Sequence, residues 1–63
     1  MLKNSVHTKR KALGLTQEDL AVLVGVTRQT IISIEKGNYV PSVLLALKIA
    51  HCFKAPLEEV FYL

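Results

Sequence analysis

The chain has 63 residues and a formal net charge of +3, so we expect one small domain over residues 1–63 that favours a polyanionic partner. Its single cysteine excludes an internal disulfide, and Cys52 is interpreted as a buried thiol within an apolar run. No charged-then-apolar leader is expected at its start, and no apolar run approaches the ~20 residues of a membrane span, which favours a cytoplasmic protein.

Hydrophobic residues make up 51% of the chain but aromatic residues only 6%. So many aliphatic side chains exceed what a domain of this size easily buries, and we expect part of them to lie in a protein interface. The basic side chains gather near the start, whereas most acidic ones come later. This asymmetry is typical of a molecule that turns one side toward a polyanion.

The first predicted helix begins near Asn4 and ends near Leu13, just before Gly14. Glycine after a basic segment fits the left-handed position that commonly ends a helix. Helical spacing then places Val6, Arg10 and Leu13 on one side of this helix.

Two further helices are predicted on either side of a glycine turn. Thr16 begins a capping pattern ahead of a helix over residues 17–24, which Gly25 ends. Thr27 is a good N-cap for the next helix, over residues 28–36. No segment of the chain alternates in the manner of a strand.

The last part of the chain predicts two more helices. Ser42 caps a helix over residues 43–53, and Pro56 begins a short one that ends near residue 61. The inner face of the first of these two is predicted to carry Val43, Ala46, Ile49, Ala50 and Phe53. We therefore expect an all-α fold, a compact bundle of five helices.

The helix over residues 28–36 has an outer face that is unusual for a solvated surface. Ile31 and Ile34 point inward on a helical wheel. The opposite side carries Arg28, Gln29, Ile32, Ser33 and Lys36. Arginine pairs with guanine, glutamine with adenine, and an aliphatic side chain contacts the thymine methyl. The order of helix, glycine turn and helix is that of a helix-turn-helix motif.

The run from residue 16 to residue 42, TQEDLAVLVGVTRQTIISIEKGNYVPS, resembles the phage-repressor/Cro-like (XRE) helix-turn-helix regulators. The resemblance extends over nearly the whole chain. It implies a lambda-repressor-like DNA-binding domain of prokaryotic or phage origin, with the helix over residues 28–36 in the major groove. We expect the bases to be read by Arg28, Gln29, Ile32 and Ser33.

Contacts to the DNA backbone are expected from residues around that helix. Gln17 lies in the first turn of its helix, where free N–H groups favour an anion, and the resemblance implies the same role. Matching family positions that often hold phosphates are occupied by Thr27, Lys36, Asn38 and Tyr39. Asn38 and Tyr39 are equally compatible with a plain loop.

The resemblance also implies an ion pair between Arg10 of the first helix and Glu35 of the third, both predicted to face inward. Such a pair would fix the orientation of the third helix more than it would stabilise the fold. Val22 and Leu44 are apolar where relatives are usually polar, so both are expected to be exposed hydrophobic residues. They fit association with another chain or a simple apolar surface.

We therefore expect a sequence-specific double-stranded DNA-binding transcriptional regulator, a repressor that acts as a homodimer on a palindromic operator. The dimer interface is expected at the C-terminal end, from Leu57, Val60, Phe61 and Leu63. One alternative is an antitoxin, whose exposed hydrophobic residues would bind a toxin. The other is a helix-turn-helix fold used only for protein–protein interaction.

No catalytic or metal-binding constellation is predicted. His7 and His51 lie far apart in the sequence with no third ligand near either. The serines lack a histidine and aspartate arranged for nucleophilic catalysis. We therefore expect no enzymatic activity, metal, cofactor or small-molecule ligand, and no membrane association.

Overall fold

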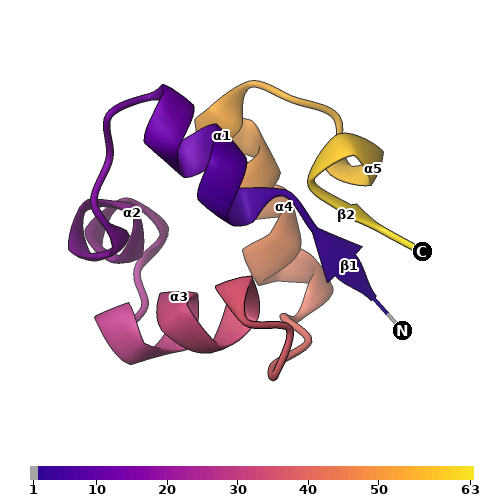
Figure 1. Ribbon diagram of the computed structural model, residues 1–63, viewed down its shortest axis with the longest axis horizontal. Coiled ribbons are helices and arrows are strands. Elements are labelled where there is room, and N and C mark those ends of the chain that lie inside the picture. The colour runs from indigo at the N-terminus through magenta and orange to yellow at the C-terminus, as the bar shows by residue number, and fades with distance from the viewer. Residues whose placement is uncertain (1) are drawn as a thin grey trace.

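Five helices and a short two-stranded ladder form the part of the chain that the computed structural model describes, residues 2–63 (Figure 1). The helices are α1 (Val6–Ala12), α2 (Gln17–Val24), α3 (Arg28–Glu35), α4 (Val43–Phe53) and α5 (Leu57–Val60). The strands are β1 (Lys3–Asn4) and β2 (Phe61–Tyr62), which pair antiparallel with Lys3 opposite Tyr62. The predicted five-helix fold is confirmed, and the ladder is an addition to it.

Side-chain caps explain where α2 and α4 begin. The Thr16 hydroxyl accepts a hydrogen bond from the Asp19 N–H at 3.0 Å, and the Asp19 carboxylate accepts one from the Thr16 N–H at 2.9 Å. Hydrogen bonding of the Asp19 carboxylate to the Thr16 backbone N–H, and secondly to the Thr16 side chain, holds the pKa of Asp19 below its ordinary value. Ser42 caps α4 by accepting from the Leu45 N–H at 3.1 Å. Each cap satisfies backbone donors that a helix start leaves free, as the sequence predicts.

The turn between α2 and α3 depends on Gly25. Its φ of 77° lies in the left-handed region, which side chains with a Cβ resist. The following N–H, that of Val26, donates to the Ala21 carbonyl at 3.0 Å and closes the end of α2. Thr27 then caps α3, so that only a short turn separates the two helices.

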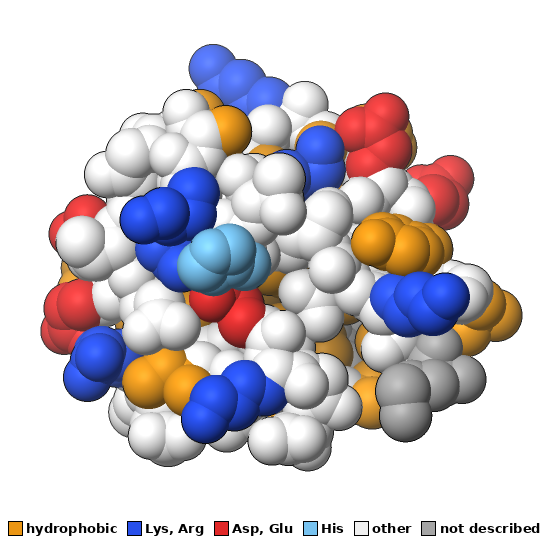
Figure 2. Space-filling view, viewed as in Figure 1, with side chains coloured by type: hydrophobic (Ala, Val, Ile, Leu, Met, Phe, Trp, Pro, Cys, Tyr) orange, Lys and Arg blue, Asp and Glu red, His pale blue; other side chains and the backbone are white. Residues whose placement is uncertain are grey.

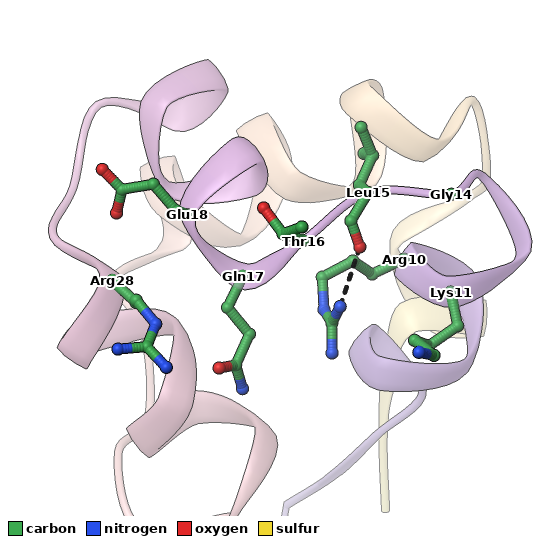
Figure 3. A pocket seen from close by; sticks show the side chains of 8 residues that line it. All are labelled: Arg10, Lys11, Gly14, Leu15, Thr16, Gln17, Glu18 and Arg28. Carbon is green, nitrogen blue, oxygen red and sulfur yellow. Dashed lines mark hydrogen bonds between the residues drawn. The ribbon is translucent and has the colours of Figure 1, made fainter.

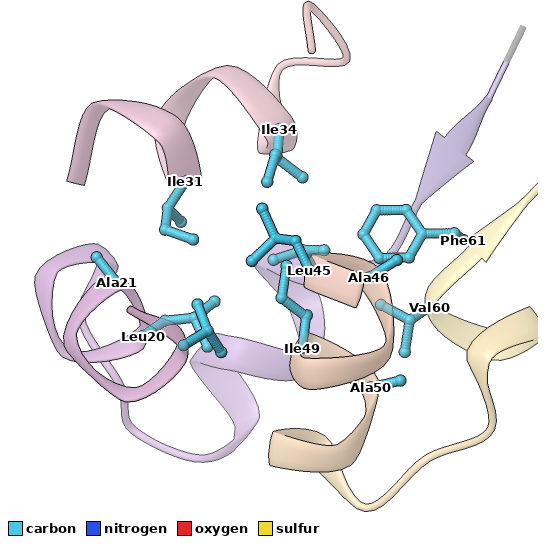
Figure 4. Close-up of a cluster of buried hydrophobic side chains, with 12 residues drawn as sticks. Leu20, Ala21, Ile31, Ile34, Leu45, Ala46, Ile49, Ala50, Val60 and Phe61 are labelled. Carbon is cyan, nitrogen blue, oxygen red and sulfur yellow. The ribbon is translucent and has the colours of Figure 1, made fainter. Parts of the chain in front are cut away.

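The hydrophobic core lies where α2, α3 and α4 meet, and the ends of α1 and α5 close it. Figure 4 shows Ile31 and Ile34 of α3 directed toward Leu45 and Ile49 of α4. The largest fully buried side chains are Leu20, Ile31, Ile34, Ile49, Val6 and Val60. Apolar positions spaced by three or four residues give each helix one inward stripe, which is why a chain this short can bury them.

Two residues expected on inner faces are exposed instead. Val43 is 73% exposed because it is the first residue of α4, at the margin of the inner stripe, and Leu45 takes the central position. Leu13 is 55% exposed because α1 ends at Ala12, so the helical wheel does not apply to it. Cys52 is half-buried rather than buried.

The C-terminal residues pack inside the protomer, contrary to part of the expected dimer interface. Val60 has no exposed surface and Phe61 only 9%. The helix ends at Val60 because Phe61 adopts extended backbone angles and pairs with Asn4 in the ladder. Neither side chain can therefore supply surface to a second chain, whereas Leu57 is half-buried and Leu63 is 90% exposed.

We predict that Phe61→Ala lowers the free energy of unfolding by about 3–5 kcal/mol, because it opens a cavity in the core. Leu44→Ala, a matched control at a side chain of α4 that is 63% exposed, should change it by no more than about 0.5 kcal/mol. Urea denaturation followed by circular dichroism measures both. Equal effects of the two variants would contradict this description of the core.

Candidate nucleic-acid interface

Helix α3 presents a polar outer face to solvent. Arg28 and Gln29 are exposed, and Ile32 and Ser33 are half-buried. The Gln29 amide lies 3.4 Å from the Ser33 hydroxyl, one turn further along the helix. Among the described residues of α3, no carboxylate lies on this face, because Glu35 points inward. A row of donors without acidic groups suits the edge of a polyanion.

A buried ion pair lies behind this face and joins α3 to α1. Arg10 Nε is 2.7 Å from Glu35 Oε2, Arg10 Nη2 is 3.2 Å from Glu35 Oε1, and each side chain is only 6% exposed. Arg10 Nη1 also donates to the Leu15 carbonyl at 2.8 Å. The ion pair that the resemblance implied is therefore present, with three elements of the chain meeting at one guanidinium.

Two further side chains reach the same carboxylate. Gln17 Nε2 and His7 Nδ1 each lie 3.2 Å from Glu35 Oε1. Burial raises the pKa of the Glu35 carboxyl, but hydrogen bonds from Arg10, Gln17 and His7, together with the Arg10 charge, outweigh it. The pKa of Glu35 therefore lies below its ordinary value, and the carboxylate is ionised at neutral pH.

A hollow of about 360 Å³ opens beside the ion pair, between the end of α1 and the starts of α2 and α3 (Figure 3). Its lining comprises Arg10, Lys11, Gly14, Leu15, Thr16, Gln17, Glu18 and Arg28. Figure 3 shows the Gln17 and Arg28 side chains extending from α2 and α3 toward the same space. Arg10 is paired with Glu35, which leaves the cations of Lys11 and Arg28 against the Glu18 carboxylate. This net positive charge makes the hollow suited to an oxyanion such as a phosphate.

The other residues expected to contact phosphates lie at the two ends of α3. Lys36, Asn38 and Tyr39 follow the helix and are exposed. Thr27 precedes it, and its hydroxyl accepts from the Thr30 N–H at 3.3 Å. The Thr27 hydroxyl also lies 3.0 Å from the Thr30 hydroxyl, and either of the two can donate to the other. The contacts of these residues with DNA stay predictions.

The structure adds two residues to the site, His7 and Lys11, for which the sequence alone predicts no role. His7 contacts Glu35 and the Arg10 guanidinium, and Lys11 lines the hollow. A signal for both was present in their spacing, since residues three and four apart share one face of a helix. His7 therefore lies beside Arg10, and Lys11 follows His7 by one turn.

Other kinds of site do not stand out in the described residues. Within residues 2–63, no three His, Cys, Asp or Glu side chains gather as a group that could hold a metal ion. In the same range, every helix is too short or too polar to cross a membrane.

Comparison with known proteins gives consistent matches along the chain. A family model described as helix-turn-helix matches residues 6–60. YgzD, an uncharacterized HTH-type transcriptional regulator of Bacillus subtilis, is 55% identical over 62 residues, which covers 98% of this chain and 94% of that protein. An uncharacterized HTH-type transcriptional regulator of Methanothermobacter thermautotrophicus is 51% identical over 63 residues, with 98% and 91% covered.

A solved structure has the same fold. The crystal structure of the restriction-modification controller protein C.AhdI from Aeromonas hydrophila matches with a TM-score of 0.79 and 33% sequence identity. The match covers 86% of this chain and 82% of that one.

We predict that Glu35→Gln destabilises the fold by roughly 3 kcal/mol at pH 7, because Arg10 then carries an unpaired buried charge. The pKa of Glu35 is lowered in the folded state, so its contribution is full above the ordinary value of 4.5 and is lost as the pH falls through the lower folded value. The stability difference between wild type and variant should therefore shrink below about pH 4.

Thermal or urea unfolding from pH 3 to pH 7 measures this difference. Glu59→Gln is the matched control, because Glu59 is 60% exposed and its 3.5 Å pair with Lys9 lies at the surface. Its effect should stay below about 1 kcal/mol. A stability difference between wild type and Glu35→Gln that is the same at pH 3 and pH 7 would show that the ionised carboxylate is not the source of that difference.

Proposed function

This chain belongs to the helix-turn-helix family of phage-repressor/Cro-like (XRE) transcriptional regulators and is a DNA-binding regulator, and from that premise we propose that it is a repressor that binds a palindromic operator as a homodimer. The observation that carries the proposal is the outer face of α3, which bears donors without acidic groups and is held from behind by a buried ion pair. We propose that α3 enters the major groove with its N-terminal end foremost.

Direct reading of bases is assigned to the exposed turns of α3. Arg28 can donate two hydrogen bonds to a guanine, and Gln29 can pair with an adenine. Ile32 lies one turn beyond Arg28 and is half-buried. The exposed part of its side chain would pack against the methyl group of a thymine. Ser33 lies within 3.4 Å of the Gln29 amide and would set the direction of that amide.

Contacts with the DNA backbone would fix the position of α3. The hollow that Gln17 and Lys11 line would take one phosphate at the near edge of the groove. Thr27 at one end of α3 and Lys36, Asn38 and Tyr39 at the other would hold the phosphates on either side. Such contacts release counterions, so affinity should fall steeply with salt concentration.

Homodimer formation is proposed because one α3 reaches only a few base pairs, and a two-fold pair of half-sites raises selectivity. With Val60 and Phe61 buried in the protomer, the proposed interface consists of Leu57, Tyr62 and Leu63. Tyr62 is 42% exposed and Leu63 90% exposed. Repression by occlusion then needs only that the bound dimer covers a promoter.

A second candidate function, as an antitoxin, is favoured by the apolar surface of α2 and α4. Val22 is 70%, Leu23 61% and Leu44 63% exposed, although none of them belongs to the proposed DNA face. An antitoxin would use this surface to bind a toxin while α3 reads DNA. A small toxic protein encoded beside this gene, with which the chain copurifies, would favour this function.

We predict that Arg28→Ala and Gln29→Ala each weaken operator binding by about 1–3 kcal/mol and relax the choice of base at one position. Lys36→Ala should instead weaken binding to all sequences alike and reduce the salt dependence by about one charge. Lys48→Ala, on α4, is the control and should change neither.

Fluorescence anisotropy with operator and single-base variants measures these effects, after selection of bound genomic fragments has identified the operator. Full operator affinity in both the Arg28 and Gln29 variants would show that another face reads the bases.

We predict that Leu63→Asp shifts the protein toward monomer and lowers operator affinity, because it places a charge in the proposed apolar interface. Leu44→Asp, the matched control on α4, should leave the dimer intact. Sedimentation at tens of micromolar measures association, and circular dichroism checks that both variants fold. A wild-type monomer at this concentration, or a Leu63→Asp protein that still dimerises, would contradict the proposed interface.

A further inference from the structure

Glu35 Oε1 has more hydrogen-bond donors near it than it can serve well. Arg10 Nη2, Gln17 Nε2 and His7 Nδ1 each lie 3.2 Å from this one oxygen. An ionised carboxylate offers about two acceptor positions on each oxygen, and the other oxygen, Oε2, accepts from Arg10 Nε. Burial fixes the Arg10 contact, so Gln17 and His7 compete for the remaining acceptor position of Glu35 Oε1.

The His7 ring lies beside one group that donates hydrogen bonds and one that accepts them. Its Nδ1 lies 3.0 Å from Arg10 Nη2, which can only donate, and 3.2 Å from Glu35 Oε1, which accepts when ionised. In the neutral ring whose proton is on Nε2, the tautomer that the Arg10 donor requires, Nδ1 accepts from Arg10 and leaves Glu35 Oε1 to Gln17. With a proton, Nδ1 donates to Glu35 and takes the position that Gln17 uses.

We propose that His7 is a positioning residue for the DNA contact of Gln17 and acts through the Glu35 carboxylate. When the ring is protonated, it occupies Glu35 Oε1 and releases the Gln17 amide toward the hollow, where the amide can donate to a phosphate. When the ring is neutral, Glu35 holds the Gln17 amide back. This inference rests on the proposed function, because it takes DNA as the ligand of Gln17.

The His7 ring is open to solvent and lies among charged groups. The His7 side chain is 64% exposed, so solvent reaches it, and histidine changes charge between about pH 5 and 8. Glu35 of α3 and Arg10 of α1 both face its Nδ1. The cationic residues near His7 in the sequence are Lys3, Lys9, Arg10 and Lys11, and Lys36 follows Glu35. In Figure 2, histidine atoms lie directly over acidic atoms, with Lys and Arg atoms beside them.

Positioning by His7 differs from a plain effect of its charge. A protonated ring on the DNA face would attract phosphates even if Gln17 were absent. Coupling through Glu35 instead requires the Gln17 amide to change partner as the ring titrates. Gln17→Ala therefore separates the two mechanisms.

The first experiment uses the free protein. Nuclear magnetic resonance from pH 5.5 to 8.5 follows the His7 ring signals and the side-chain NH₂ signals of Gln17. We expect the Gln17 signals to shift with the midpoint of the His7 ring, to lose that shift in His7→Gln, and to keep it in His51→Gln, the matched control on α4. Gln17 signals that stay constant through the His7 titration would overturn the proposal.

The second experiment measures Kd for the operator at constant salt from pH 8 to pH 6. We expect wild type and His51→Gln to bind about three- to tenfold more tightly at pH 6, because one coupled proton links the two equilibria. His7→Gln and Gln17→Ala should each lose most of this change. A Gln17→Ala protein with the full pH dependence would assign the effect to charge alone and overturn the positioning role.

The two experiments separate the inference from the function on which it rests. A protein that binds no DNA at any pH would contradict the proposed function, while the Gln17 signals of the free protein would still decide whether His7 controls that amide. Circular dichroism confirms that His7→Gln folds, as expected for an exposed side chain.

Discussion

The buried contact between Arg10 and Glu35 is the interaction on which the orientation of α3 depends. Arginine does not lose its charge in proteins, so a buried guanidinium needs its carboxylate. The cost of burying both charges cancels much of their attraction, and the net gain in stability is small. Any other orientation of α3, however, would leave Arg10 unpaired at 6% side-chain exposure, a penalty of several kcal/mol. The pair therefore selects one arrangement of the helices, and the outer face of α3 follows from it.

The N-terminal strand supports the same last turn of α3 through a second contact. Asn4 Nδ2 donates to the Ile34 carbonyl at 2.9 Å, and Asn4 Oδ1 accepts from the Val6 N–H at 3.1 Å. Because β1 also pairs with β2, the start and the end of the described chain meet beside the last turn of α3. Phe61 is part of this clamp, which explains why it packs inward. With Phe61 buried, Tyr62 and Leu63 are the large hydrophobic side chains that the described residues expose at the C-terminal end.

Local signals in the sequence predict most of the fold, and contacts between distant residues account for what they miss. Caps at Thr16, Thr27 and Ser42 act over three residues, so they place α2, α3 and α4 from short stretches of sequence. The ladder joins residues at opposite ends of the chain, for which no local pattern exists. The outer face of α3 follows from helical spacing alone. The contact of Gln17 with Glu35 does not follow from spacing, because it depends on how α2 and α3 pack.

The buried ion pair and the proposed phosphate contact of Gln17 share one carboxylate, that of Glu35. Glu35 joins α1, α2 and α3, and its pKa lies below the ordinary value, so the ion pair stays intact throughout the neutral range. The network contains arginine, glutamic acid, glutamine and histidine, and histidine is the residue type among them that serves as a switch between protonation states. A change at His7 can therefore alter the partner of Gln17 while the Arg10–Glu35 pair, and with it the fold, stays unchanged. On the function that we propose, the phosphate contact of Gln17 then changes while the arrangement of the helices stays the same.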